Sequence, residues 1–194
     1  MVLTEIEKED RKLGKKLYDY QHGAIDLIFE HINSNPDNYN LLYQLPTGGG
    51  KTVIFSEIAR KYIATTGKKV LILTHRIELS KQTSQMLLEF GVSNKIIDSN
   101  VKMVSNDPNY HCFVAMVETL NNRLKEGKVS LSDIGMVIVD EAHLIPPDGE
   151  GMYRQFLADL KMISPHARII GLTATPYRMT TGMICGPENL LNHV

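Results

Sequence analysis

A glycine-rich segment with the sequence LPTGGGKT, at residues 45–52, constrains the fold of this chain more than any other stretch. It follows an apolar run at 39–45 that is typical of a strand, and the run that begins at Val53 is typical of a helix. Such a turn can bind phosphate, because its backbone N–H groups approach the oxygens without an intervening Cβ and the helix start adds unpaired donors. The predicted phosphate-binding residues are Thr47, Gly48, Gly49, Gly50, Lys51 and Thr52.

We expect specific roles in nucleotide binding for two of these residues. Lys51 is expected to reach the β- and γ-phosphates of a nucleotide, and the Thr52 hydroxyl is expected to ligate Mg²⁺. The alternative is a plain glycine turn between a strand and a helix.

Composition limits the classes of protein that fit the chain. It has 194 residues, 43% of them hydrophobic, and a formal net charge of −1. This length predicts one domain, or two small ones at most. Because the charge is near zero, any nucleic-acid binding must rely on a local patch. The two cysteines, Cys112 and Cys185, form no C-x-x-C pair, and we interpret them as reduced thiols of an intracellular protein.

The sequence predicts neither secretion nor membrane insertion. No stretch approaches the ~18 apolar residues of a membrane span. Charged residues crowd positions 5–12, where a signal peptide would have an apolar core. We therefore expect an intracellular protein, cytoplasmic or associated with the nucleoid, with no membrane partner.

Strand-like and helix-like runs alternate along the chain after a charged lead-in at 1–16. Apolar periodicity predicts helices at 17–32, 51–65, 76–89, 117–125 and 151–163, and strands at 40–44, 69–74, 94–97, 101–104, 111–115, 135–139 and 168–172. Several strands are almost continuous apolar runs, which is typical of strands buried on both sides. We expect an α/β domain over 17–194, with a mainly parallel sheet and helices on both faces.

Polar clusters follow four of the predicted strands. They are the glycine-rich segment and the groups at 74–76 (THR), 140–143 (DEAH) and 173–175 (TAT). Ligands of parallel α/β sheets bind at the carboxyl ends of the strands. The four clusters are therefore expected to meet at one edge of the sheet and to form a site there.

The acidic pair at 140–141 suits nucleotide hydrolysis. Asp140 is expected to hold Mg²⁺, directly or through water, because a hard cation prefers oxygen ligands. Glu141 is expected to orient and deprotonate the attacking water as a general base. An acidic pair that merely caps a strand end is the alternative, but it does not explain the whole Asp-Glu-Ala-His tetrapeptide downstream of a phosphate-binding turn.

With these motifs in this order, the chain resembles the superfamily 2 helicases and translocases, DEAH-box branch, over residues 17–178. The form TGGGKT, with Leu45 at the position where the general pattern has Gly or Ala, is similar to the helicase variant of the phosphate loop. The segments LTATPYR at 172–178 and THRIEL at 74–79 look closest to the RadD-like and restriction-enzyme-like group. The resemblance implies a RecA-like P-loop fold, here the first of two such domains, and the cofactors ATP and Mg²⁺.

The resemblance also implies roles for individual residues. Gln21 matches the glutamine that reads adenine, which a carboxamide can do because it both donates and accepts; a surface residue on an amphipathic helix is the alternative. The residues that match nucleic-acid contacts are His75, Arg76 and Thr119. The residues that match the coupling of hydrolysis to strand binding are His143, Thr173 and Thr175.

Several of these roles have plain structural alternatives. Arg76 could be a solvated charge in the first turn of a helix, Thr119 an ordinary N-cap, and His143 a core histidine. Arg123 is expected to lie on a solvated helix face.

The leading functional hypothesis is the ATP-binding half of a motor that moves on or unwinds nucleic acid, with DNA favoured over RNA. The second RecA-like domain, which supplies arginine fingers worth about 10³–10⁵ in rate, is expected to be missing from this chain. We therefore expect slow hydrolysis by the chain alone. The alternatives are a non-enzymatic nucleotide- or nucleic-acid-binding module that regulates a partner, and a small-molecule kinase, which would need no DEAH segment.

Overall fold

The computed structural model describes residues 19–34, 41–44, 50–98, 110–126, 134–140, 152–173, 177–178 and 182–183. Within them the helices are α2 (Asp19–Ser34), α3 (Lys51–Thr66), α4 (Ile77–Glu89), α5 (Val117–Lys125) and α6 (Met152–Ile163). The strands are β1 (Leu41–Gln44), β2 (Lys69–Thr74), β3 (Asn94–Ile97), β4 (Cys112–Met116), β5 (Ile134–Asp140), β6 (Arg168–Thr173), β7 (Tyr177–Arg178) and β8 (Gly182–Met183).

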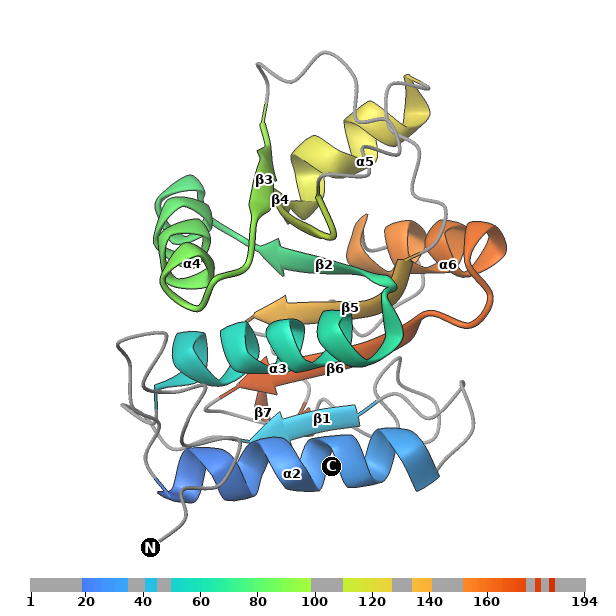
Figure 1. The fold of residues 1–194 in the computed structure, drawn as a ribbon. Coiled ribbons are helices and arrows are strands. Elements are labelled where there is room, and N and C mark those ends of the chain that lie inside the picture. Colours follow the sequence, from blue (N-terminus) through green and yellow to red (C-terminus); the bar gives the residue numbers. More distant parts are fainter. Residues whose placement is uncertain are drawn as a thin grey trace, which may run out of the picture.

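Six of these strands form one sheet in which every pair of neighbours is parallel, in the order β1-β6-β5-β2-β4-β3 (Figure 1). The predicted parallel sheet is therefore confirmed. Strand β6, late in the sequence, lies between β1 and β5. Its last residue, Thr173, pairs with Gln44 of β1, and Leu172 pairs with Asp140 of β5. The carboxyl ends of these three strands are therefore level with one another.

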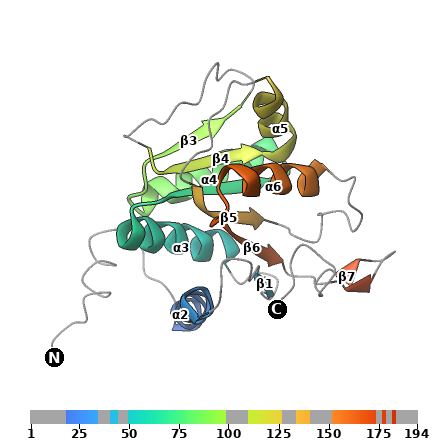
Figure 2. The same cartoon turned by 90° about the vertical axis from the view of Figure 1, so that its right-hand side faces the viewer.

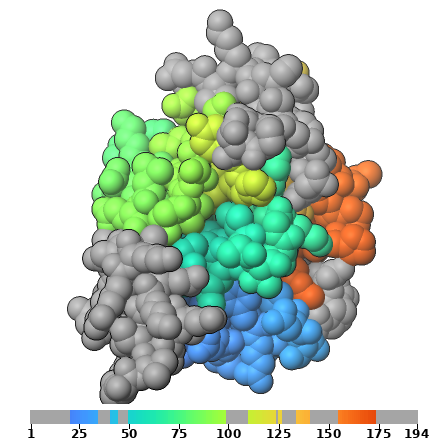
Figure 3. All heavy atoms as spheres, viewed as in Figure 1, coloured from blue at the N-terminus to red at the C-terminus, as the bar shows by residue number. Residues whose placement is uncertain are grey.

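Helices cover both faces of the sheet, as predicted (Figure 2). Along β2, the side chains of Val70 and Ile72 pack in a core with α2, α3 and α4, whereas those of Leu71 and Leu73 pack in a second core with α5 and α6. Successive residues of a strand point to opposite faces, so a strand buried on both sides must be apolar at every position. The space-filling view shows α2, α3 and α4 side by side on their face (Figure 3).

The predicted elements agree closely with the structure. The five helices begin and end within two residues of their predicted limits, and the six strands of the sheet do so as well. The predicted strand at 101–104 lies outside the described residues, and the small antiparallel pair β7–β8 was not predicted. Cys112 is a free thiol whose pKa burial raises to about 12.

One local expectation is wrong. Arg123 does not lie on a solvated face, because its side chain is only 14% exposed and its Nη1 lies 4.0 Å from Oε2 of Glu126.

None of the described helices combines the length and the hydropathy that a bilayer crossing requires.

The register of β5 against β2 shifts at Gly135. Lys69 pairs with Ile134, but the next residue, Val70, pairs with Met136, so Gly135 is the extra residue. Because of this shift Ile134 faces the core of α5 and α6, while Met136 faces the opposite core. A Cβ at position 135 would overlap the Tyr62 hydroxyl and lie 2.9 Å from Cβ of Lys68. Only glycine fits between the sheet and the end of α3.

We therefore predict that Gly135→Ala lowers the free energy of unfolding by about 1–3 kcal/mol, the usual cost of overpacking a buried site. Gly23→Ala is the matched control, since position 23 lies within α2 and a Cβ there meets no atom within 4 Å. That variant should gain about 0.5–1 kcal/mol from helix propensity. Chemical denaturation of both variants checks the opposite signs, and a neutral Gly135→Ala would contradict the close approach.

Candidate functional site

The glycine-rich segment leads into α3 through a backbone conformation that favours glycine. Gly50 precedes the helix with φ 71° and ψ 42°, in the left-handed region, and its carbonyl accepts a hydrogen bond from the N–H of Ile54 at 3.1 Å. Among the described residues no side chain caps this helix start. The first N–H groups of any α-helix have no partner within the helix, so the start of α3 can offer such donors to an anion, beside the partial positive charge of the helix dipole.

The first residue of α3 reaches across the sheet to the end of β5. Nζ of Lys51 lies 3.0 Å from Oδ1 of Asp140, and the two side chains are 21% and 9% exposed. Strand β6 lies between β1 and β5, so the strand that leads into the glycine-rich segment and the strand that ends in Asp140 are two strand spacings apart, about 10 Å. The long lysine side chain spans this gap.

Three more predicted residues lie near this edge. Thr52 follows Lys51 in the first turn of α3 and is half-buried. Thr173 is fully buried at the end of β6, between the two strands that the ion pair connects. Gln21 is 3% exposed in the first turn of α2, so the alternative of a surface residue is wrong. Figure 1 places the starts of α2 and α3 at the same end of the molecule.

The residues predicted to contact nucleic acid follow β2 and β4, which pair with each other in the sheet. Thr74 of β2 pairs with Met116 of β4, so the turn that holds His75 and Arg76 lies beside the start of α5. Arg76 is exposed, with an extended backbone immediately before α4. His75 is half-buried, and its buried Nδ1 has no hydrogen-bond partner in the described structure. Thr119 is the third residue of α5 rather than the residue before it, so the alternative of an N-cap is wrong.

A pair of buried hydroxyls supports this turn. Oγ1 of Thr74 lies 2.6 Å from Oγ of Ser80, and both hydroxyls lie 3.4 Å from the carbonyl oxygen of Arg76. Ser80 was not among the predicted residues, although its spacing offered a signal: a small polar residue four positions after Arg76, on the face of α4 that faces the sheet. Asn121 was not predicted either; it is 3% exposed on α5, and its Oδ1 has no hydrogen-bond partner in the described structure.

Six further residues of the predicted site fall outside the part of the chain that the structure describes. They are Thr47, Gly48, Gly49, Glu141, His143 and Thr175. Their roles stay predictions from the sequence.

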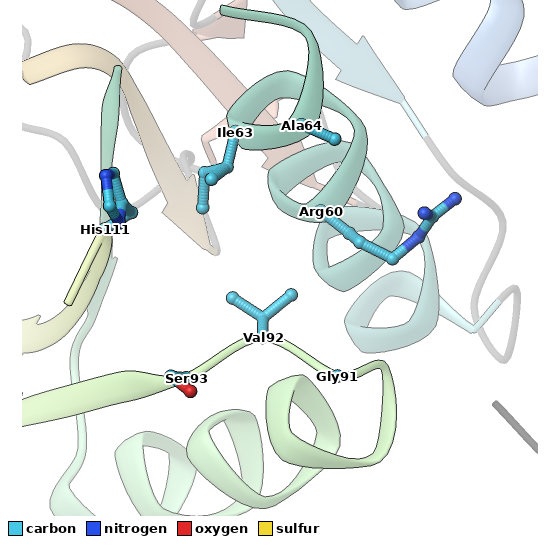
Figure 4. Close-up of a pocket in the computed structure, with 7 residues that line it drawn as sticks. All are labelled: Arg60, Ile63, Ala64, Gly91, Val92, Ser93 and His111. Carbon is cyan, nitrogen blue, oxygen red and sulfur yellow. The ribbon is translucent and has the colours of Figure 1, made fainter. Parts of the chain in front are cut away.

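A hollow of about 320 Å³ lies at the amino-terminal ends of the strands, between the end of α3 and the segments that precede β3 and β4. Figure 4 shows Ile63 and Val92 pointing into it, while the guanidinium of Arg60 turns away. That guanidinium is held by Glu57, with Nε 2.8 Å from Oε2. This hollow is distant from the residues predicted to bind the nucleotide, and it is not part of the candidate site.

Geometry and comparison together define the class of protein. A solved structure described as the Hef helicase domain of Pyrococcus furiosus superposes with a TM-score of 0.60 at 27% identity, over 79% of this chain and 34% of that one. The restriction-modification enzyme LlaGI, solved with a DNA substrate mimic, gives a TM-score of 0.64 at 18% identity, over 92% of this chain and 19% of its own, which supports the fold alone. The chain is a RecA-like ATP-binding domain of the superfamily 2 helicase class, in agreement with the sequence prediction.

Sequence comparison identifies the family of this chain within that class. A profile of the family described as "Type III restriction enzyme, res subunit" matches residues 14–178, and the chain belongs to this family. It is 26% identical over 173 residues to the human protein "Helicase POLQ-like", covering 83% of this chain and 15% of that protein. It is 29% identical over 143 residues to the "ATP-dependent DNA helicase Hel308" of Pyrococcus abyssi, covering 70% and 19%. The chain thus spans less than a fifth of the length of these two relatives.

The two glycines that bound α3 provide a test of the site. Gly50 and Gly67 both have φ near +70°, but Gly67 lies at the far end of the helix. Alanine at either position should cost about 1 kcal/mol of stability, because an L-residue is strained in the left-handed region. Only Gly50→Ala should also weaken nucleotide binding, since only that strain displaces Lys51 and the first N–H groups.

Calorimetric titration with ADP, together with unfolding curves, separates these two effects. Equal nucleotide affinities for the two variants would contradict the placement of the phosphate site at the start of α3.

Proposed function

We propose that this chain is the ATP-binding half of a nucleic-acid-dependent motor, in which ATP hydrolysis drives movement on, or unwinding of, a nucleic acid. The observation that carries the proposal is the approach of Lys51 Nζ to Asp140 Oδ1, 3.0 Å apart at the carboxyl edge of a parallel sheet. This approach supports the proposal because a lysine suited to bind phosphate lies beside a carboxylate suited to bind a metal ion, the combination that nucleotide hydrolysis requires.

Magnesium fits the residues at this edge. The Thr52 hydroxyl and the Asp140 carboxylate offer the oxygen donors that a hard cation prefers, and Mg²⁺ is usually bound by one or two such groups together with substrate phosphates. Among the described residues no group of three or more His, Cys, Asp and Glu side chains gathers into an all-protein cage. The ion would neutralise charge on the β- and γ-phosphates, while Lys51 and the N–H groups of α3 bind and orient them. Gln21 is proposed to read adenine.

Hydrolysis is assigned to the DEAH segment that begins with Asp140. Glu141 follows it directly, and its carboxylate is proposed to orient and deprotonate the attacking water. Thr173 ends the strand between the phosphate loop and Asp140, so its position suits a residue that couples the nucleotide to the nucleic acid. His143 and Thr175 are proposed as its partners in that coupling.

Nucleic acid is proposed to bind at the ends of β2 and β4. The exposed Arg76 and the neighbouring His75 and Thr119 can contact phosphates, which position a strand without reading its sequence. The net charge of −1 favours such a local contact surface over bulk attraction. DNA is favoured over RNA, in keeping with the relative described as a DNA helicase. Because the proposed partner is a nucleic acid, the protein is proposed to act inside the cell.

A second RecA-like domain in the same polypeptide is proposed to complete the motor. The curated relatives named above are more than five times longer than the part of them that this chain matches. An arginine finger from such a domain is worth about 10³–10⁵ in rate. The isolated chain should therefore bind nucleotide but hydrolyse it slowly.

The decisive experiment measures ATP hydrolysis by this chain and by a longer polypeptide that includes it, with and without single-stranded DNA, duplex DNA or RNA. We expect the longer form to be stimulated by nucleic acid and the chain alone to be nearly inert. Lys51→Ala and Glu141→Gln should each lower the stimulated rate by at least about 100-fold, because they remove phosphate binding and the general base. If no nucleic acid stimulates either form, a nucleotide-binding module replaces the motor.

The contact assigned to Arg76 has its own test. Arg76→Ala should weaken the binding of single-stranded DNA and reduce the salt dependence of the affinity by about one phosphate contact. Lys81→Ala is the matched control, because Lys81 is also exposed on α4 but lies more than one turn further along the helix. Fluorescence anisotropy across a salt series measures both slopes. An unchanged slope for Arg76→Ala, or an equal loss for the control, would remove this contact.

A further inference from the structure

The turn between β2 and α4 contains two features that work against its own stability. Arg76 occupies the position immediately before α4, where a short polar side chain ordinarily accepts hydrogen bonds from the first N–H groups of the helix. In the part of the chain that the structure describes, no other side chain takes over that role. His75 beside it has a buried Nδ1 without a hydrogen-bond partner in the same described part. Both features cost stability, so something else must fix the conformation of this turn.

A hydrogen bond between two buried hydroxyls closes the turn. Thr74 is the last residue of β2, and Ser80 lies in the first turn of α4. Their side-chain oxygens are 2.6 Å apart, although six positions separate the two residues in the sequence. The two residues are 0% and 1% exposed, so water does not compete for this bond. It therefore joins the end of the strand to the start of the helix independently of the backbone between them.

The same hydroxyls also contact the backbone of Arg76. Each hydroxyl oxygen lies 3.4 Å from the carbonyl oxygen of Arg76, which accepts a further hydrogen bond from the N–H of Ser80 at 3.2 Å. Two hydroxyls have two protons, and their mutual bond uses one, so one hydroxyl at a time donates to this carbonyl. The contacts to the carbonyl are longer than the bond between the hydroxyls and therefore weaker. Together they fix the direction in which the extended backbone of Arg76 enters α4.

We infer that Thr74 and Ser80 are positioning residues for the nucleic-acid contact at Arg76. The inference rests on the proposed function, which assigns a phosphate to this arginine. Because both hydroxyls are buried, they act through the turn and do not touch the nucleic acid themselves. A fixed backbone leaves the long arginine side chain fewer directions to search, which lowers the cost of ordering it when a strand binds.

The test uses variants that separate positioning from stability. Thr74→Val keeps the shape of the side chain and removes the hydroxyl, whereas Thr74→Ser keeps the hydroxyl and removes a methyl group. In Thr74→Val the buried hydroxyl of Ser80 loses its strong partner, which lowers stability. Combining Thr74→Val with Ser80→Ala should recover much of that stability, because no unsatisfied hydroxyl of the pair then remains. Chemical denaturation measures the stability of each variant.

Positioning predicts that affinity and stability respond differently to these changes. Fluorescence anisotropy measures the binding of single-stranded DNA to the full 194-residue chain across a salt series. Thr74→Val and the double variant should both bind about three- to tenfold more weakly, the cost of ordering one long side chain. Thr74→Ser should retain the affinity of the unmodified chain. If the pair only stabilised the fold, the affinity of the double variant would recover together with its stability.

A double-mutant cycle identifies the residue through which the pair acts. In an Arg76→Ala background, loss of the two hydroxyls should change the affinity by less than about twofold, because the side chain that they position is already absent. With Arg76 present, their loss should also reduce the salt slope by up to about one phosphate contact. An equal loss of affinity in both backgrounds would overturn the assignment to Arg76.

Ser84→Ala is the matched control for loss of a hydroxyl on the same helix. Ser84 lies one turn beyond Ser80, and its hydroxyl also makes a hydrogen bond of 2.6 Å, to Oδ1 of Asn94. That bond joins α4 to the start of β3 rather than to the end of β2. Its loss should lower stability and leave the affinity for DNA unchanged.

The outcomes distinguish this inference from the proposed function. If the unmodified chain binds single-stranded DNA and Thr74→Val binds as tightly as Thr74→Ser, the hydroxyls do not position the contact, although the proposed function stands. If the unmodified chain binds no single-stranded DNA even at low salt, the proposed nucleic-acid site fails, and the inference fails with it. Should the double variant not fold, the comparison of Thr74→Val with Thr74→Ser still decides.

Discussion

Burial of the central strands on both faces is the constraint on which the rest of this structure depends. Every residue of β5 is buried, and along β2 alternate side chains enter separate cores above and below the sheet. Every pair of neighbouring strands in this sheet is parallel, and parallel strands need crossover connections that bring the chain back to the edge where the previous strand began. All six strands therefore end at one edge. Polar groups excluded from the two cores can collect there, where the strands stop.

The order of the strands then decides which polar groups meet. With β6 between β1 and β5, the start of α3 and the end of β5 are close enough for the Lys51 side chain to connect them, although β1 and β5 do not pair with each other. The same order places Thr173 between them and puts the Arg76 turn on the far side of β5. The proposed nucleotide site and the proposed nucleic-acid site thus lie at neighbouring parts of one edge, and β5 adjoins both, because it pairs with β6 on one side and with β2 on the other.

The local elements could be predicted from the sequence because each is specified by its own residues. Apolar runs define β2, β5 and β6, and the glycine at position 50 marks a left-handed turn before a helix. The strand order could not be predicted in the same way, because nothing in the residues of β6 states that it inserts between β1 and β5. Features that arise from packing between distant segments were missed for the same reason. The register shift at Gly135 depends on the approach of Tyr62 and Lys68 from the end of α3.

Asp140 illustrates how a sequence can mark a candidate site without giving its geometry. A charged residue at the end of a fully buried strand contributes less to folding than an apolar one of similar volume would, since the ion pair it forms must first be desolvated. Packing alone therefore gives no reason for a carboxylate at this position. A residue that departs from the local packing rule, beside a cation that does the same, indicates a site built for a ligand.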